Sequence, residues 1–374
     1  MMTTIDSELK EIKANGNLRR IPADSTESGR VDFSGNDYLG LSLRTDLRDE
    51  FLSNTDPADM IMSASASRLL ASRQKAFSAF ENVLEKAYGR SALLFNSGYH
   101  ANTGMVSALA TKDYTILADK LVHASIIDGI RLSGAPFERF RHNDMRHLSS
   151  LAEKASAQGR KLLIIAESVY SMDGDKAPIG ELAEIKRKYP DALLYIDEAH
   201  AVGVEGPAGL GECMRPGICA DDVDVVVGTL GKALASAGAY VIASESVRSW
   251  AINRARSFIF STALPPVNVL WSKFIFEKAM DMDSERRKLK QLGRRLGEAL
   301  GTGSESHIQP YMVGDPHEAL RISRILKDDG FDVLPIRTPT VPPGTDRLRI
   351  SLSAALNEDD IISLGNALNR LKHE

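Results

Sequence analysis

The chain has 374 residues, of which 43% are hydrophobic and 26% are charged. This composition is ordinary for a globular protein and excludes a disordered chain, a collagen or a coiled-coil rod. Lys and Arg number 46 against 50 for Asp and Glu, a net charge of −4, so general nucleic-acid binding, which depends on neutralising phosphates, is not expected. The basic run at 286–290 is flanked by acidic residues and predicts the solvated face of a helix.

Short apolar runs alternate with helical patterns through the middle of the chain. Between the runs, Phe77, Phe80 and Leu84 recur at helical spacing, as do Leu182, Ile185 and Tyr189. Runs that are apolar on both faces suit the buried strands of a parallel sheet. The expected strands are Ala92–Asn96, Thr115–Ala118, Lys161–Glu167, Ala192–Asp197 and Asp224–Gly228. The alternation predicts an α/β fold, with a mostly parallel sheet sandwiched by helices.

The pattern changes near residue 245, where helical stretches at about Val247–Arg256 and Pro266–Leu300 begin. A smaller α+β pattern closes the chain. Its expected helices are Glu318–Asp329 and Asp359–Leu371, and its expected strands are Phe331–Leu334 and Arg347–Leu352. We therefore expect an N-terminal arm at 1–50, a large α/β domain at 51–260, and connecting helices with a small C-terminal α+β domain at 261–374.

Three features bear on the cellular location. The two cysteines, Cys213 and Cys219, are too few for a disulfide framework and fit free thiols in a reducing compartment. The N-terminus has neither a basic segment nor an apolar one, so no signal peptide is expected. The longest stretch without charged residues, Ala92–Thr111, contains Asn96, His100 and other polar residues, and is too polar to span a bilayer. These features predict a cytoplasmic protein with no membrane partner.

A polar turn follows the first expected strand. Ser97, Gly98 and Tyr99 lead from that strand into a helical run that begins near Thr103. Free backbone N–H groups at a helix N-terminus make an anion site, most often for phosphate. Taken alone, the turn also fits a purely structural role.

The fourth expected strand ends in Asp197, Glu198, Ala199 and His200. Ligands of open α/β sheets bind at this edge. A carboxylate and an imidazole there could serve a metal, a catalytic pair or a heterocyclic cofactor. No third ligand occurs at a plausible spacing, so no metal is predicted, and Glu198 is assigned a structural role.

The next strand leads to Lys232, which lies between Gly231 and Ala233. A Walker loop would need a glycine in place of Val226 and a Ser or Thr in place of Ala233, so that interpretation fails. A lone loop lysine is usually solvated. If it is partly desolvated near other cations, however, its amine becomes a nucleophile.

Together these three features match the needs of pyridoxal phosphate. Its phosphate needs N–H donors, its ring nitrogen needs an anion, and its aldehyde needs a lysine. The turn at Gly98, the carboxylate of Asp197 and the amine of Lys232 meet these needs in chain order. A phosphate-binding structural protein would leave Asp197 and Lys232 unexplained, and a non-catalytic regulator would usually carry a basic DNA-binding module, which is lacking here.

Over nearly its whole length the chain resembles the α-oxoamine synthases, pyridoxal-phosphate enzymes of the aspartate-aminotransferase fold (fold type I). The motifs that carry the resemblance are Asp32–Leu41, Ser67–Leu70, Asp119–Ser125, His142–Asp144, Ser168–Asp175, Asp197–His200, Gly228–Leu234 and Phe260–Pro266. The chain departs from the family pattern at Ser63–Ala66 and at Ala235, where glycines are usual, and at His100, where a small residue is common.

The resemblance implies a role for each matched residue. Lys232 would bind the cofactor aldehyde, Asp197 the ring nitrogen and His200 the phenolic oxygen, while His123 would stack on the ring; these four are the expected catalytic residues. The other expected cofactor contacts are Ser171, the phosphate ligands Gly98, Tyr99 and Thr229, and Ser261 and Thr262 from a partner subunit. The last two imply a homodimer with a shared active site.

The segment Pro339–Ala354 resembles most closely the family branch that makes a biotin precursor. The resemblance implies an acyltransferase that joins L-alanine to a pimeloyl group carried by coenzyme A or acyl carrier protein. The substrate residues implied are Arg19, Asn36, His123, Thr340 and Arg349. Arg347, on the same strand as Arg349, is expected to be a surface residue. The alternative within the family is a glycine-using enzyme that makes 2-amino-3-oxobutyrate, a glycine C-acetyltransferase.

Overall fold

The computed structural model describes residues 2–19, 21, 29–219 and 221–371. The chain forms two compact units. The large unit comprises Leu39–Ser171 and Asp175–Arg286, and the small unit comprises Met1–Tyr38, Met172–Gly174 and Arg287–Glu374. The expected arm, large domain and small domain had their boundaries after residues 50 and 260, and that three-part division stays a prediction.

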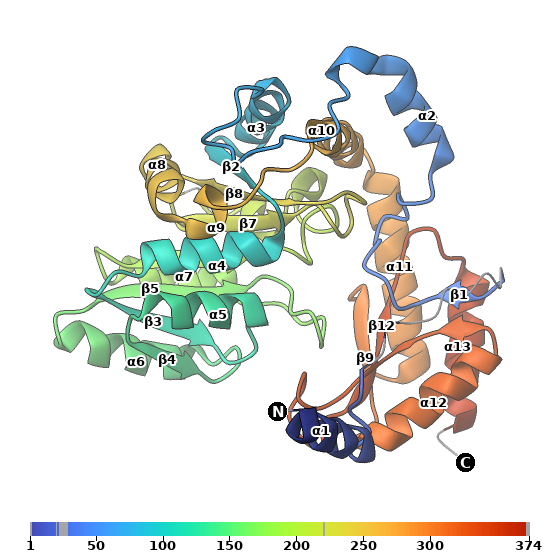
Figure 1. Cartoon of the computed structure of the whole chain (residues 1–374). Coiled ribbons are helices and arrows are strands. Elements are labelled where there is room, and N and C mark those ends of the chain that lie inside the picture. The colour runs from blue at the N-terminus through green and yellow to red at the C-terminus, as the bar shows by residue number, and fades with distance from the viewer. Residues whose placement is uncertain (1, 20, 22–28, 220, 372–374) are drawn as a thin grey trace. The chain divides into compact units, whose positions relative to one another are not determined.

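The large unit is built on a seven-stranded sheet in the order β2-β8-β7-β6-β5-β3-β4 (Figure 1). The strands are β2 (Ser91–Phe95), β3 (Tyr114–Asp119), β4 (Phe137–Phe140), β5 (Lys161–Glu167), β6 (Leu193–Asp197), β7 (Val225–Thr229) and β8 (Ala239–Ala243). β8 pairs antiparallel with both β2 and β7, and the other ladders are parallel. The prediction of a mostly parallel sheet is confirmed. Because parallel strands end at one edge, the residues that follow β5, β6 and β7 gather there.

Helices cover both faces of this sheet. The helices are α2 (Thr45–Asn54), α3 (Lys75–Tyr88), α4 (Gly98–Leu109), α5 (Ala124–Ser133), α6 (Met145–Ala157), α7 (Ile179–Arg187), α8 (Glu245–Arg254), α9 (Arg256–Ile259) and α10 (Pro266–Met280), with short 3-10 turns η1 (Pro57–Asp59), η2 (Pro207–Gly209) and η3 (Glu212–Met214). α4 and α5 lie side by side (Figure 1). The core on their face includes Met105 and Ile126 from these helices and Ile165, Tyr195 and Val227 from the strands.

The small unit contains two small sheets. β1 (Val31–Asp32) pairs parallel with β10 (Phe331–Asp332), and β9 (Ile308–Met312), β11 (Leu334–Ile336) and β12 (Arg347–Ser351) form an antiparallel sheet with β12 in the middle. Its helices are α1 (Met2–Ala14), α12 (Pro316–Asp328) and α13 (Glu358–Leu371), together with most of α11 (Asp283–Leu300), which starts in the large unit. The expected small α+β pattern is confirmed.

The expected helix over Pro266–Leu300 is wrong as a single element, because the chain breaks at Asp281 and Met282 between α10 and α11. Strands β1, β4, β8 and β9 had no counterpart in the sequence-based expectation. Among the described residues, no helix combines the length and the apolar character needed to cross a bilayer.

Candidate active site

Asp197 is the last residue of β6 and is 4% exposed. Its Oδ1 accepts a hydrogen bond from the Ala199 backbone N–H at 2.8 Å, and its Oδ2 accepts one from the Asn102 side-chain amide at 2.7 Å. Both donors are neutral, and no ion pair to this carboxylate is found among the described residues. A buried carboxylate without a paired cation is costly. The site is therefore suited to a ligand that brings a positive charge.

Lys232 and His200 meet beside this carboxylate. His200 follows β6 and is buried, while Lys232 follows the neighbouring strand β7 and is half-buried. The Lys232 Nζ lies 2.7 Å from the His200 Nε2. The amine is thus held at the edge of the sheet where Asp197 also ends, as the sequence predicted.

His123 lies directly before α5 and forms the N-cap of that helix. Its Nδ1 lies 3.2 Å from the Ser125 backbone nitrogen and 2.7 Å from the Ser125 Oγ. Its own backbone N–H donates to the carboxylate of Glu167. Partial burial of the imidazole lowers the pKa of His123, and the Lys232 charge acts in the same direction, although Asp197 opposes both.

The expected phosphate turn is the N-terminus of α4. Ser97 is the N-cap, and its Oγ accepts from the His100 backbone N–H at 3.2 Å and lies 2.8 Å from the His100 Nδ1. Thr229, at the end of β7, adjoins the turn, since a side-chain carbon at Gly98 would come 3.8 Å from the Thr229 Oγ1. The Tyr99 phenol donates to Asp128 at 2.5 Å. Gly98 and Thr229 are thus brought together as expected.

Three further predicted cofactor residues lie in loops of the large unit. Ser171 follows β5 and is the last residue before the segment that belongs to the small unit. Ser261 and Thr262 follow α9, and the Thr262 carbonyl accepts a hydrogen bond from the Asn96 amide, directly before the phosphate turn. Their predicted contact across a dimer involves a second chain and stays a prediction.

The substrate residues expected in the small unit form two groups. Arg349 is 4% exposed, and it donates to the Asn36 Oδ1 at 3.0 Å, to the Tyr38 hydroxyl at 3.3 Å and to the Ser351 Oγ at 2.6 Å. Burial raises the pKa of Tyr38 to about 12, although Arg349 partly offsets the effect. The phenol therefore stays protonated.

The second group joins the two remaining substrate residues. Arg19 donates to the Thr340 Oγ1 at 2.8 Å. These residues are 321 positions apart in the chain, so the resemblance brought together a pair that spacing alone could not.

Arg347 was expected at the surface, and this expectation is wrong. It is 5% exposed, forms an ion pair with Asp173 and donates to the Thr345 carbonyl at 2.8 Å. The segment Met172–Gly174, which carries Asp173, belongs to the small unit, so the partner of Arg347 lies far away in sequence.

Four buried polar residues at the site were not predicted: Asn102, Ser125, Glu167 and Tyr195. Glu167 pairs in register with Asp197 on the neighbouring strand. Burial raises the pKa of Glu167 well above its ordinary value, and the charge of Asp197 acts in the same direction. Asn102 gave one available signal, because an amide in the apolar helical run Ala101–Leu109 needs a buried partner.

Two departures from the family pattern fall where the backbone is left-handed. Ala235 has a φ of 41° and Ser65 has a φ of 56°. This conformation favours glycine, which accounts for the glycines usual at these positions. The Ala235 carbonyl accepts from the Trp271 Nε1 at 3.1 Å, which helps to hold the turn after Lys232.

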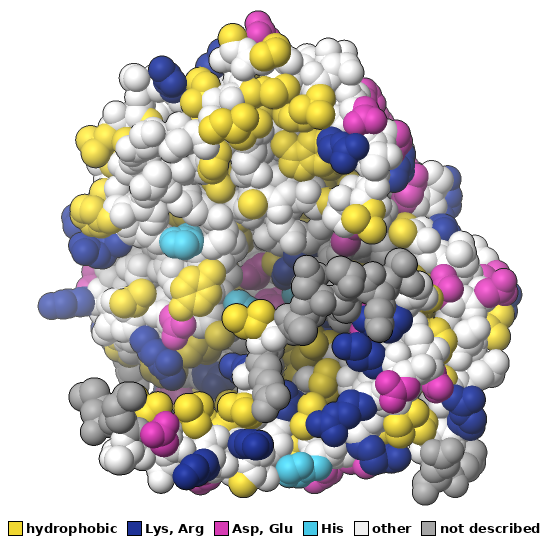
Figure 2. All heavy atoms as spheres, turned by 45° about the vertical axis from the view of Figure 1, so that its right-hand side comes forward, with side chains coloured by type: hydrophobic (Ala, Val, Ile, Leu, Met, Phe, Trp, Pro, Cys, Tyr) yellow, Lys and Arg dark blue, Asp and Glu magenta, His cyan; other side chains and the backbone are white. Residues whose placement is uncertain are grey.

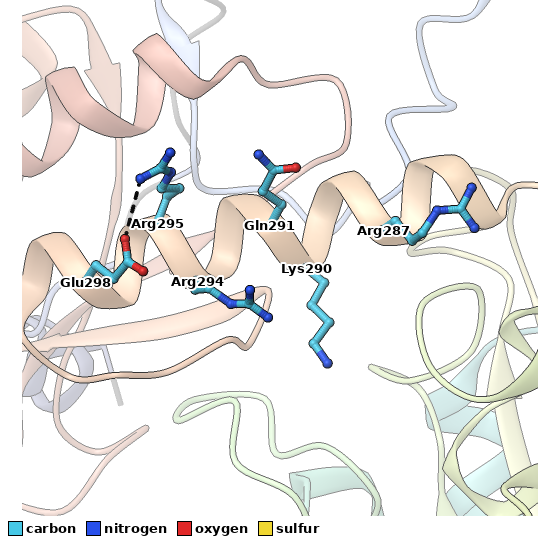
Figure 3. Close-up of a pocket in the computed structure, with 6 residues that line it drawn as sticks. All are labelled: Arg287, Lys290, Gln291, Arg294, Arg295 and Glu298. Atoms are coloured by element: carbon cyan, nitrogen blue, oxygen red, sulfur yellow. Dashed lines mark ion pairs between the residues drawn. The ribbon is translucent and has the colours of Figure 1, made fainter.

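The basic run expected as a solvated helix face is part of α11. A surface hollow of about 440 Å³ lies along this helix, lined by Arg287, Lys290, Gln291, Arg294, Arg295 and Glu298 (Figure 3). Lys290 and Arg294 pair with Glu305, and Arg295 pairs with Glu358. Arg286 departs from the expectation, because it is 8% exposed and donates to the Ala279 carbonyl. This face carries internal ion pairs rather than a run of uncompensated charge.

The residues of the large unit fit pyridoxal phosphate. Asp197 is a buried carboxylate held by neutral donors, the Lys232 amine lies next to an imidazole, and the α4 N-terminus adjoins the Thr229 hydroxyl. These groups match the ring nitrogen, the aldehyde and the phosphate of the cofactor in turn.

Comparison with known proteins decides the family. The family model described as aminotransferase class I and II matches residues 29–368. The chain belongs to the aminotransferase class I and II family. Within this family it is 42% identical over 376 residues to a putative 8-amino-7-oxononanoate synthase of Pasteurella multocida, covering 96% of this chain and 97% of the relative. It is 45% identical over 347 residues to the 8-amino-7-oxononanoate synthase of Haemophilus ducreyi, covering 89% of each.

Solved structures of the family agree. Serine palmitoyltransferase from S. paucimobilis, with bound PLP–myriocin aldimine, matches with a TM-score of 0.88 and 27% identity over 99% of this chain and 97% of that one. The 8-amino-7-oxononanoate synthase of Francisella tularensis matches with a TM-score of 0.78 and 28% identity over 93% of this chain and 99% of that one. The aminotransferase fold and the family expected from the sequence are confirmed.

Proposed function

We propose that this chain is a pyridoxal-phosphate-dependent acyltransferase of biotin biosynthesis. It joins L-alanine to a pimeloyl thioester and releases carbon dioxide and the thiol, which leaves 8-amino-7-oxononanoate. The observation that carries the proposal is the convergence of Asp197, His200 and Lys232 at the ends of β6 and β7. Full-length relatives named for this synthase support the choice of reaction.

The site residues of the large unit, Lys232, Asp197 and His200, each have a defined role in this proposal. Bound pyridoxal phosphate supplies an electron sink for the charge that develops on the α-carbon of the amino acid. Lys232 holds the cofactor and moves the α-proton through its Nζ. Asp197 keeps a proton on the ring nitrogen by its negative charge. His200, within 2.7 Å of the lysine amine, orients that amine and contacts the cofactor's phenolic oxygen.

The remaining roles follow the predicted sites. Arg349 binds the carboxylate of the amino acid, because a guanidinium can form two parallel hydrogen bonds with a carboxylate. Asn36, which accepts from Arg349 at 3.0 Å, sets the position of that guanidinium. Arg19 and Thr340, linked at 2.8 Å, are assigned to the pimeloyl substrate. Ser171 contacts the cofactor's oxygen, and the Gly98–Tyr99 turn and Thr229 hold its phosphate.

A homodimer completes the site in this proposal, with Ser261 and Thr262 reaching the phosphate of the partner. Large apolar side chains are exposed on the large unit, among them Met62 at 73%, Leu70 at 80% and Phe260 at 69%. Apolar side chains also gather on the face shown in Figure 2. Such exposure marks an interaction surface, and Phe260 directly precedes Ser261. A cytoplasmic location is part of the same proposal.

The decisive experiment follows the lysine and the substrates separately. Purified protein with pyridoxal phosphate should show the absorbance of a lysine-bound cofactor, and borohydride should fix the cofactor to the peptide that contains Lys232. Lys232→Ala should lose both the adduct and turnover, whereas the exposed Lys154→Ala should lose neither. Product should form with L-alanine and pimeloyl-coenzyme A or the pimeloyl carrier protein. An adduct on a different lysine, or turnover with glycine and acetyl-coenzyme A alone, would contradict the proposal.

A further inference from the structure

Three buried polar side chains connect Asp197 with His123 in the candidate active site. Tyr195 and Ser125 are fully buried and Asn102 is 2% exposed. Tyr195 and Asp197 are two residues apart on β6, so both point to the face of the sheet that α4 covers. Asn102 projects from α4 between them and contacts both.

The hydrogen bonds of Asn102 fix the orientation of its amide. The Tyr195 hydroxyl lies 2.7 Å from the Asn102 Oδ1, and the Asn102 Nδ2 lies 2.7 Å from the Asp197 Oδ2. An ionised carboxylate only accepts hydrogen bonds, so the amide nitrogen has to face Asp197. The amide oxygen then faces Tyr195, which donates to it. Burial and the nearby Asp197 charge raise the pKa of Tyr195 well above its ordinary value, so the phenol keeps the proton that it donates.

The second N–H of the same amide continues the chain toward His123. The Asn102 Nδ2 donates to the Ser125 Oγ at 2.9 Å. That oxygen lies 2.7 Å from the His123 Nδ1, and the Ser125 backbone N–H points at the same ring nitrogen from 3.2 Å. Since Ser125 accepts from Asn102, its hydroxyl proton is available for His123. The ring nitrogen Nδ1 therefore accepts from two donors.

We propose that Tyr195, Asn102 and Ser125 form a one-way hydrogen-bond chain that holds His123 as the neutral tautomer protonated at Nε2. A proton on Nδ1 would face two donors, the backbone N–H and the hydroxyl of Ser125, and would break the chain. The ring thus presents an N–H donor, and the same chain holds the Asp197 carboxylate through Asn102. Tyr195, Asn102 and Ser125 are positioning residues, because they act through His123 and Asp197.

The charges around the ring agree with a neutral imidazole. Partial burial and the Lys232 ammonium favour the neutral form, while Asp197 and Asp128 favour the charged one, and burial wins. Glu167, which accepts from the His123 backbone, is buried, and burial raises its pKa, which disfavours its charged form. The tautomer rests on the chain's own residues, whereas its use as a donor to a bound substrate rests on the proposed function.

The tautomer can be read directly by NMR of protein with ¹⁵N-labelled histidine, without and with pyridoxal phosphate. The chain has 8 histidines, and a His123→Gln variant identifies the signal. We expect a protonated Nε2 and an unprotonated Nδ1 at pH 7.5 in both forms. A proton on Nδ1 or a doubly protonated ring in the wild type would overturn the proposal without any variant, and this outcome is independent of turnover.

Variants test the chain itself. Ser125→Ala removes the hydroxyl donor and should mix the two tautomers and raise the titration midpoint of His123 by about one pH unit. Ser125→Cys is nearly isosteric and keeps a weak donor, so its His123 titration midpoint should lie between those of the wild type and Ser125→Ala. Tyr195→Phe should shift the Asn102 amide and give a smaller change in the same direction. Tyr240→Phe is the matched control, because Tyr240 is a buried tyrosine on a nearby strand whose hydroxyl bonds Tyr88 instead.

Activity gives the second readout. In Ser125→Ala, kcat/KM for L-alanine should fall about three- to ten-fold, the cost of one neutral hydrogen bond. Tyr240→Phe should leave it unchanged. If Ser125→Ala and Tyr195→Phe keep the wild-type tautomer and midpoint of His123, the chain does not set the protonation of the ring. A catalytically inactive wild type with the expected tautomer would instead contradict only the proposed function.

Discussion

At the scale of single residues, the negative charge of Asp197 is the central feature of the site. The carboxylate is 4% exposed, and its hydrogen bonds come from a backbone N–H and a neutral amide. Neutral donors orient a charge but do not cancel it, so the carboxylate keeps its charge for a cationic group of a ligand. A protonated ring nitrogen would cancel it on binding.

Replacing this charge tests its role without removing the side chain. Asp197→Asn should still bind pyridoxal phosphate measurably but should slow exchange of the L-alanine α-proton in D₂O by roughly 100-fold or more, because the ring becomes a poorer electron sink. Proton NMR of the exchange gives the rate. Asp222→Asn, which changes an aspartate that pairs with Arg187 before the start of β7, is the control. Undiminished exchange in Asp197→Asn would remove this role from the residue.

The two arginines of β12 separate substrate binding from stability. Arg349→Ala should weaken L-alanine binding about 30- to 1000-fold, the loss of a charge-assisted pair of ~2–4 kcal/mol. Arg347→Ala loses the ion pair with Asp173 and should lower the free energy of unfolding by about 1–3 kcal/mol, with a much smaller effect on binding.

Titration with L-alanine, followed by the cofactor's absorbance, measures the first effect, and urea unfolding measures the second. If alanine binding is unchanged in Arg349→Ala and weakened in Arg347→Ala, the substrate carboxylate has been assigned to the wrong arginine.

The residues that sequence reasoning found and missed differ in one physical respect. Asp197 ends one apolar strand and Lys232 follows the next, and the ends of parallel strands lie at one edge of the sheet, so the local pattern predicted that both residues lie at that edge. Ser125 and Tyr195 both act through Asn102, which lies 23 residues from Ser125 and 93 residues from Tyr195 in the chain. Nothing in the local sequence indicates such distant pairs. Arg347 was misplaced for the same reason, since its partner Asp173 is 174 residues away.

At the scale of elements, His142 links two loops of the large unit. Its Nδ1 lies 2.9 Å from the carboxylate of Asp119 at the end of β3, and its Nε2 lies 2.7 Å from that of Asp175 in the loop after β5. Partial burial alone would lower the pKa of His142, but hydrogen bonds and charge from both aspartates outweigh it and raise the pKa to about 10. The loop that carries Ser171 is thereby tied to the sheet edge.

This linkage predicts how stability depends on pH. A histidine whose folded pKa of about 10 exceeds its unfolded value of about 6.5 stabilises the fold fully below pH 6.5 and loses that contribution as the pH rises to 10. His142→Gln should therefore be less stable than the wild type at low pH, and its free energy of unfolding should approach that of the wild type as the pH rises from about 6.5 to about 10. Urea unfolding at pH 6, 8 and 10 measures the difference. Asp175→Asn should move the window to lower pH, and a difference that is constant with pH would contradict the linkage.

The elements themselves were predictable to different degrees. β5 was predicted with its observed ends, since Leu162–Ala166 is a continuous apolar run between the charged residues Lys161 and Glu167. β8 is also fully buried and forms a hairpin with β7, but its other antiparallel pairing is with β2, a strand far away in the chain. The break between α10 and α11 was missed because the helical pattern continues on both sides of Asp281 and Met282.

At the scale of the whole molecule, a shared active site predicts that two defective chains can complement each other. In a hybrid dimer of Lys232→Ala with the double variant Ser261→Ala and Thr262→Ala, one site carries both defects and the other carries none. Random pairing makes half of the dimers hybrids, so activity should recover to about a quarter of wild type. Coexpression with two affinity tags isolates the hybrid for assay and for sizing by light scattering. If each chain instead supplies its own Ser261 and Thr262, every site of the hybrid keeps one defect and the hybrid stays inactive, which would contradict the shared site. A fully active monomer at assay concentration would contradict it as well.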